Sequence, residues 1–190
     1  ILGLDPADLI EAVNRHQGSS HRRYKVVANL PYYITSAVLR HLLESDPRPE
    51  LMVITVQREV AERIVAPPGD MSILAVSVQF YGNPELLFRI KPGSFHPSPD
   101  VESAVLRVDV HARTPLPEAE TDAFFTVVRA GFSQRRKQLH NSLSAGLGEH
   151  ISKHQAAARL KEADVDPRRR AQSLSVEEWI AVTRALRDAI

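Results

Sequence analysis

The first half of the chain alternates between short continuous apolar runs and amphipathic stretches. Short apolar runs between turn signals are typical of buried strands, and apolar residues spaced by three and four are typical of helices. Their alternation predicts βαβ units around a parallel sheet. The predicted elements are a helix from about Pro6, a strand at 24–28, a helix at 35–44, a strand at 51–56, a helix at 59–66 and closing strands at 86–90 and 101–110.

The segment Met71–Tyr81 fits two patterns. Leu74, Val76, Val78 and Phe80 alternate as in a strand, and the helical count is nearly as good. Periodicity alone therefore favours a strand here, by a small margin.

The second half of the chain reads as helical. Two prolines and a polar run in "HARTPLPEAET" indicate a linker, and Ser175 with Glu178 forms a capping box at a helix start. The sequence thus predicts an α/β domain at 1–114 and a small helical domain at 115–190. The helices of the second domain are expected at 120–130, 134–147, 151–163 and 176–189.

Composition limits the possible functions. The 190 residues carry a net charge of +1. They include no cysteine, and this absence excludes a disulfide framework and thiolate metal sites. No apolar stretch approaches the roughly 20 residues that cross a bilayer. The sequence predicts a soluble cytoplasmic protein with no membrane partner. His150 and His154 have a spacing that can bind a metal, but a surface pair is the simpler interpretation.

The tetrapeptide Asn29-Leu30-Pro31-Tyr32 follows a continuous apolar run, which predicts a strand covered on both faces. In open α/β sheets, ligands gather beyond the carboxyl ends of such strands. Pro31 lacks an N–H and holds Leu30 extended, so the Leu30 carbonyl and the Asn29 amide are available acceptors beside the Tyr32 ring. This set suits a flat group with an exocyclic amine, such as adenine. The alternative is an ordinary turn whose tyrosines, Tyr32 and Tyr33, pack on the next helix.

A second loop, "KPGSFHPSPDVESAVL", carries Phe95 among three prolines. It is either a stiff loop with Phe95 in the core or one side of an aromatic clamp. In the second case an extruded base would lie between Tyr32 and Phe95.

Basic residues gather in the helical region. Residues 115–190 contain 12 basic and 10 acidic residues, and residues 123–148 contain no Asp or Glu. Basic runs on helices are often only solvated faces, but an acid-free stretch indicates phosphate contacts. The candidate RNA-binding residues are Arg129, Arg135, Arg136 and Lys137, with a second cluster at Arg168, Arg169 and Arg170.

Four segments together resemble the ribosomal RNA adenine N6-dimethyltransferase family, whose bacterial members are the kasugamycin-sensitivity methyltransferases. The resemblance runs along the whole chain. It implies that Met71–Tyr81 is a helix, whereas the periodicity of this segment favours a strand. The segments are Asn29-Leu30-Pro31-Tyr32, "VQREVAERIVAPPG", the loop Phe95-His96-Pro97-Ser98-Pro99-x-Val101-x-Ser103, and "FSQRRKQLHNSL".

The resemblance implies a Rossmann-like class I methyltransferase domain followed by a small all-helical domain. It implies methyl transfer from S-adenosylmethionine, without a metal, to two adjacent adenines near the 3′ end of small-subunit rRNA in immature ribosomal subunits. Residues 29–32 correspond to the catalytic motif, Asn29 also lies against the cofactor in this family, and Phe95 corresponds to the second stacking aromatic.

The chain departs from the family in one respect. The Gly-rich loop and the two acidic residues that bind the cofactor lie upstream of the motif in this family, and no counterpart is present here. The chain is therefore expected to be the C-terminal part of a larger enzyme, inactive alone. Without upstream strands, residues 24–28 would form an exposed apolar edge that self-associates, aggregates or retains a cleaved N-terminal piece.

Two other functions remain open. The first is a non-catalytic RNA-binding factor of the same fold, acting in ribosome assembly or transcription. The second is a DNA or protein-glutamine methyltransferase, which shares the logic of the tetrapeptide but not the Phe95 loop or the block at 133–143.

Overall fold

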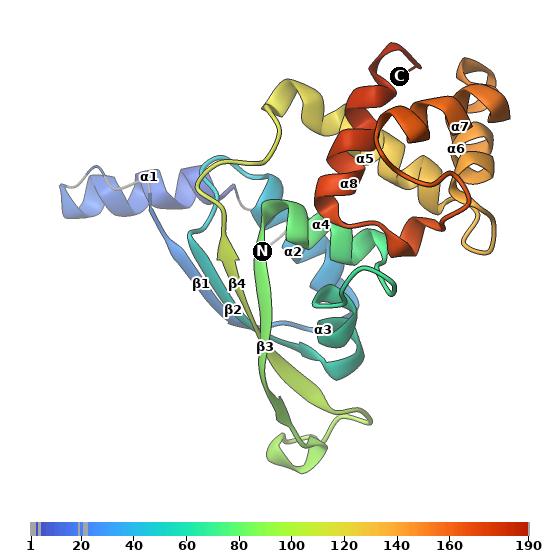
Figure 1. Cartoon of the computed structure of the whole chain (residues 1–190). Coiled ribbons are helices and arrows are strands. Elements are labelled where there is room, and N and C mark those ends of the chain that lie inside the picture. Colours follow the sequence, from blue (N-terminus) through green and yellow to red (C-terminus); the bar gives the residue numbers. More distant parts are fainter. Residues whose placement is uncertain (1–2, 4, 19, 21–22, 190) are drawn as a thin grey trace. The chain divides into compact units, whose positions relative to one another are not determined.

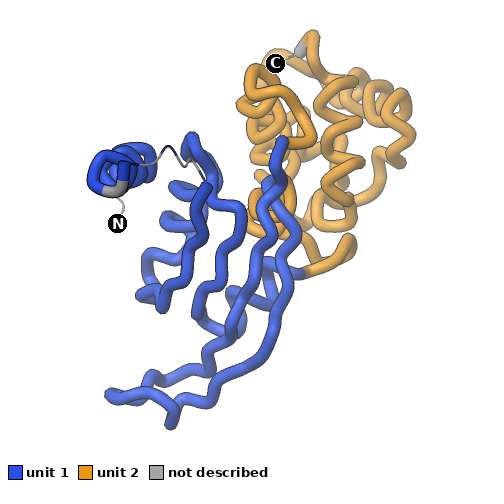
Figure 2. Tube along the Cα trace, turned by 90° about the vertical axis from the view of Figure 1, so that its left-hand side faces the viewer, with its two compact units in different colours: residues 1–65, 81–113 blue, residues 66–80, 114–190 orange. Residues whose placement is uncertain are grey.

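The sheet and the C-terminal helices belong to two different compact units in the computed structural model, which describes residues 3, 5–18, 20 and 23–189. Figure 2 shows the first unit, residues 1–65 and 81–113, and the second, residues 66–80 and 114–190. Residues 66–80, which the sequence analysis assigns to the α/β region, thus belong to the helical unit. The roles assigned to the two predicted domains stay predictions.

The first unit contains a mixed sheet of four strands in the order β1-β2-β4-β3. Strand β1 (Lys25–Asn29) is parallel to β2 (Leu51–Gln57), as expected for a βαβ unit. Strand β4 (Ser103–Val110) runs antiparallel to both β2 and β3 (Gly82–Ile90). The α/β class is confirmed, but the sheet is not wholly parallel, because β3 and β4 are joined by a hairpin loop rather than a crossover helix (Figure 1).

Three helices accompany this sheet: α1 (Pro6–Gln17), α2 (Thr35–Glu44) and α3 (Arg58–Ile64). Helix α1 begins at Pro6, as predicted, and the Asp5 side chain caps it by accepting a hydrogen bond from the Ala7 N–H at 2.8 Å. Helix α2 has the predicted bounds and buries four aliphatic side chains, those of Val38, Leu39, Leu42 and Leu43.

Strand β1 lies at an edge of the sheet, and its predicted burial on both faces is wrong. Val27 is 83% exposed, and Val26 and Ala28 are only half-buried. Exposure alternates along β1, with Lys25, Val27 and Asn29 exposed, so one face of this strand is open to solvent. In addition, β1 has a single neighbour, β2, among the described strands. The apolar edge expected for residues 24–28 is present, whereas self-association through it stays a prediction.

The second unit is built from α5 (Glu118–Phe132), α6 (Leu139–Leu147), α7 (Lys153–Glu162) and α8 (Val176–Ala185), with most of α4 (Ile73–Tyr81). Helix α8 has the predicted capping box of Ser175 and Glu178. Helix α6 begins later than predicted, because residues 134–137 form a turn after α5.

Helix α4 confirms the resemblance and overturns the periodicity. Its Ala75, Val76, Val78 and Phe80 are all buried, and the Phe80 ring stacks on Phe124 with centroids 4.5 Å apart. A helix buried on several sides lacks the polar face that makes helical periodicity visible. In the described part of the chain, no helix is long and apolar enough to cross a membrane.

Candidate functional site

The tetrapeptide begins where β1 leaves the sheet. Asn29 is the last residue of β1 and lies in register with Thr55 of β2. The Leu30 N–H donates to the Thr55 carbonyl at 3.2 Å, and the Leu30 side chain is buried. The backbone of both residues is therefore held by β2.

Two polar groups of this segment are free to bind a ligand. The Asn29 residue is exposed, and within the described residues neither its side-chain amide nor the Leu30 carbonyl has a hydrogen-bond partner. The next carbonyl, of Pro31, accepts from the Ile34 N–H at 3.2 Å in the turn η1 (Tyr32–Ile34). The acceptor pair that the sequence predicts is thus available on a fixed backbone.

The two tyrosines of this segment have different environments. Tyr33 is 89% exposed, so it does not pack on α2 as the turn interpretation would require. Tyr32 is half-buried, and its hydroxyl shares a 2.6 Å hydrogen bond with the Ser103 hydroxyl of β4. Nothing in the sequence singled out Ser103 as Tyr32's partner, since 71 residues separate the pair.

The Phe95 loop leaves the sheet at the same end as the tetrapeptide. Gln57, at the end of β2, pairs with Ser103, and Ser103 also pairs with Ile90, the last residue of β3. Phe95 follows the short turn η2 (Pro92–Ser94) and is half-buried rather than part of the core. Among the described side chains, no ring contact joins Phe95 to Tyr32. Their role as a clamp stays a prediction.

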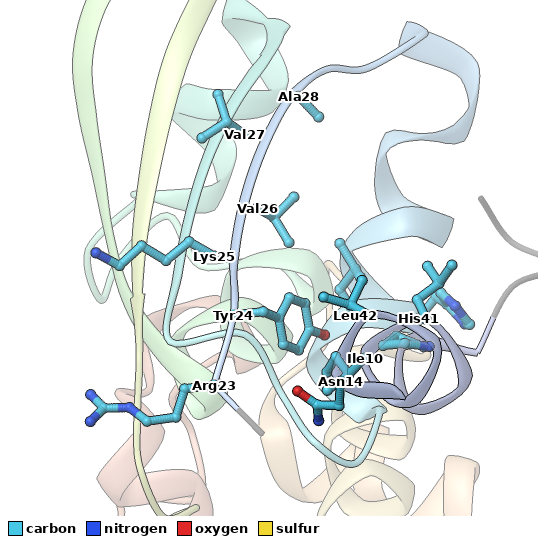
Figure 3. A pocket seen from close by; sticks show the side chains of 13 residues that line it. Ile10, Asn14, Arg23, Tyr24, Lys25, Val26, Val27, Ala28, His41 and Leu42 are labelled. Atoms are coloured by element: carbon cyan, nitrogen blue, oxygen red, sulfur yellow. The ribbon is translucent and has the colours of Figure 1, made fainter. Parts of the chain in front are cut away.

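A cavity of about 580 Å³ lies beside β1. Figure 3 shows it among side chains of α1, β1 and α2, with Tyr24, Val26 and Leu42 facing it. The lining contains no Asp or Glu but two cationic residues, Arg23 and Lys25. Its residues are Pro6, Leu9, Ile10, Val13, Asn14, Arg23, Tyr24, Lys25, Val26, Val27, Ala28, His41 and Leu42.

These cavity residues do not fit S-adenosylmethionine, the donor that the family implies. Among the described residues, no carboxylate lines the cavity to accept hydrogen bonds from the ribose hydroxyls of this donor. The Arg23 and Lys25 side chains point away from the cavity in Figure 3, and Arg23 forms an ion pair with Glu50. Asn29 does not line the cavity. Asn29 is the one candidate residue that the sequence analysis places against S-adenosylmethionine.

The two basic clusters of the second unit lie beside each other. The Leu139 N–H at the start of α6 donates to the Arg169 carbonyl at 2.7 Å, and the His140 N–H donates to the Pro167 carbonyl at 3.3 Å. The segment 135–137 therefore adjoins the loop 166–170. We call these two segments the basic corner.

Most of the candidate RNA-binding side chains are available to solvent. Within the described part of the chain, no salt bridge involves Arg129 or four members of the basic corner: Arg135, Arg136, Lys137 and Arg170. Arg168 is exposed and lies 3.4 Å from the Asp166 carboxylate, Nε to Oδ1. The exposed candidates are Arg129, Arg135, Arg136, Lys137, Arg168 and Arg170.

Arg169 differs because protein groups surround its guanidinium. It forms an ion pair with the Glu178 carboxylate, including an Nη2–Oε2 distance of 3.0 Å, and its Nε donates to the Ser173 hydroxyl at 3.1 Å. Hydrogen bonding to Arg169 lowers the pKa of Glu178, and the same bond raises the pKa of Arg169. These contacts tie the loop 166–170 to the start of α8. Because they occupy the Arg169 guanidinium, RNA binding by Arg169 itself stays a prediction.

The fold is that of the Rossmann-like methyltransferases. The chain aligns with the crystal structure of a dimethyladenosine transferase from Plasmodium falciparum with a TM-score of 0.76 at 22% identity, covering 87% of this chain and 67% of that one. It aligns with the crystal structure of the 23S rRNA methyltransferase ErmE with a TM-score of 0.66 at 22% identity, covering 96% and 79%.

The chain belongs to the family described as "Ribosomal RNA adenine dimethylase", which matches residues 5–187. It is 51% identical over 156 residues to the ribosomal RNA small subunit methyltransferase A of Dehalococcoides mccartyi strain 195, covering 82% of this chain and 53% of that protein. It is 47% identical to the protein of the same description from Desulfitobacterium hafniense strain DCB-2, covering 85% and 58%. The chain thus spans little more than half the length of these relatives.

Proposed function

We propose that the full-length product of the gene encoding this chain dimethylates N6 of two adjacent adenines in the 3′-terminal hairpin of small-subunit rRNA. The methyl donor is S-adenosylmethionine, and the substrate is the immature small subunit in the cytoplasm. One observation carries this proposal: the Asn29 amide and the Leu30 carbonyl, which have no hydrogen-bond partner among the described residues, stand at the end of β1 in the segment that continues to Tyr32.

The acceptor pair acts on the adenine amine. That nitrogen is a weak nucleophile because its lone pair is delocalised into the purine ring. If Asn29 Oδ1 and the Leu30 carbonyl each accept one amine hydrogen, they favour a pyramidal nitrogen with a localised lone pair. The bond from the Leu30 N–H to Thr55 holds the backbone between the two acceptors before the base arrives.

The basic corner supplies RNA affinity. Its exposed cations can contact several phosphates at once, and phosphate contacts position an RNA without reading its sequence. We assign Arg129, which lies on α5, to the same RNA-binding surface of the protein.

The test is a methyl-transfer assay with the full-length gene product, immature small subunits and labelled S-adenosylmethionine. Mass spectrometry of the digested rRNA should show N6,N6-dimethyladenosine at two neighbouring positions. The chain of residues 1–190 should give none, because its cavity does not fit the donor. Binding of the subunits without any methylation by the full-length product would instead favour a non-catalytic assembly factor.

The exposed β1 edge predicts self-association of the isolated chain. Val27→Lys should shift it toward monomer in sedimentation velocity, because a charge on an edge strand opposes pairing with another strand. Leu87→Lys, on the opposite edge strand β3, is the matched control and should leave association unchanged. A monodisperse monomer for the unsubstituted chain would contradict this prediction.

A further inference from the structure

The Tyr32 side chain is held at both ends. Its Cβ is attached to the backbone of the turn η1, and its hydroxyl shares the 2.6 Å hydrogen bond with Ser103 Oγ. Ser103 is 0% exposed, and Tyr32 is the one partner of its hydroxyl among the described residues. A buried hydroxyl without a partner is costly, so the two groups are strongly coupled.

The anchor itself is rigid. Ser103 is the first residue of β4 and has paired neighbours on both sides, Gln57 in β2 and Ile90 in β3. The residue before it is also fixed, since the Glu102 carbonyl accepts from the Arg58 N–H at 2.9 Å and the Glu102 carboxylate lies 3.4 Å from the Arg58 guanidinium. Ser103 therefore belongs to the sheet and not to the loop 91–102.

We propose that Ser103 is a positioning residue for adenine recognition: its hydroxyl holds the Tyr32 ring where an adenine stacks while Asn29 and Leu30 accept the amine hydrogens. The inference rests on the proposed function. A tyrosine attached only through Cβ can change its χ1 rotamer, and a second attachment at the para oxygen prevents that movement.

The same bond relates the two sides of the clamp. Ser103 ends the loop 91–102 that carries Phe95, while Tyr32 belongs to the tetrapeptide. Holding Tyr32 against Ser103 fixes the point from which the Phe95 loop departs relative to the Tyr32 ring. A base between the rings then meets a preset geometry instead of one that must form on binding.

The test compares Tyr32→Phe, Ser103→Ala and the double variant in the full-length gene product. Tyr32→Phe keeps the ring and removes only the hydroxyl. Each single variant should lower kcat about tenfold with the KM for RNA within about twofold, since misplacement affects the reacting geometry more than phosphate binding. The double variant should be no slower than either single one, because all three break the same bond.

Two further variants separate the hydrogen bond from packing. Ser103→Thr keeps the hydroxyl and should restore most of kcat. Tyr33→Phe removes a hydroxyl from the exposed neighbouring ring and should leave kcat unchanged. Three results would each overturn the inference. The first is that the losses in kcat of the two single variants multiply in the double variant, and the second is that only KM changes. The third is that Ser103→Thr, unfolding like the unsubstituted protein, fails to restore kcat.

A second readout distinguishes failure of the inference from failure of the proposed function. An RNA hairpin with 2-aminopurine at a target adenine should lose fluorescence when the base stacks on Tyr32, and Tyr32→Phe and Ser103→Ala should weaken this quenching equally. If quenching depends on both hydroxyls but the unsubstituted protein never methylates, the positioning role stands and the proposed function falls. If the protein methylates and both variants quench normally, the positioning role falls alone.

Discussion

Replacing Asn29 by alanine should abolish adenine methylation by the full-length gene product while RNA affinity stays within about twofold. In the proposed mechanism Asn29 supplies one of the two acceptors for the amine hydrogens. Its side chain is uncharged and has no hydrogen-bond partner among the described residues, so the substitution removes neither a phosphate contact nor an internal bond. Loss of a preorganised polar group that acts on the reacting atom typically lowers kcat by about 10²–10³. Single-turnover methylation and filter binding, run on the same preparations, measure the two effects.

Asn83→Ala is the matched control, because Asn83 is also an exposed asparagine on a strand of this sheet. It should retain full activity. Asn29→Asp should be faster than Asn29→Ala, since a carboxylate also accepts hydrogen bonds from the amine. An alanine variant with more than about a tenth of the original kcat would show that Asn29 Oδ1 does not act on the amine.

Removing the charges at 135–137 should weaken RNA binding by about two orders of magnitude without changing kcat at saturating RNA. The triple variant combines Arg135→Ala, Arg136→Ala and Lys137→Ala. All three side chains are exposed and have no salt bridge within the described part of the chain. The slope of log affinity against log salt should become shallower by about 2 to 3, because each lost phosphate contact removes about 0.7–0.9.

The control for this variant is Arg40→Ala on α2, which is also exposed and whose Nε lies 3.0 Å from a Glu44 carboxylate oxygen. It should leave both affinity and salt slope unchanged. An unchanged slope in the triple variant would mean that these side chains face solvent rather than RNA. Equal losses for both variants would mean that only the overall charge of the protein matters.

Helix starts could be predicted because their signals are local. Asp5 caps α1 with its own side chain, and the Ser175 and Glu178 pair that caps α8 is separated by three residues. Such contacts form within one turn of the chain, so residue order is sufficient to find them.

The Met71–Tyr81 segment shows where periodicity is insufficient. Val76, Val78 and Phe80 alternate and are all buried, but they are buried in a helix, with Phe80 stacked on Phe124 from α5. Burial on several sides removes the contrast on which a periodic pattern depends.

The sequence by itself determined the order of most elements, the tetrapeptide at the end of β1 and the presence of two basic clusters. Only the tertiary structure decided that Tyr32 is bound to Ser103, that the Arg169 carbonyl meets the start of α6 and that Val27 is exposed. The first set depends on neighbours along the chain, whereas the second depends on which distant segments pack together. Packing is chosen by the total burial and hydrogen bonding of the whole fold, and no local pattern records that choice.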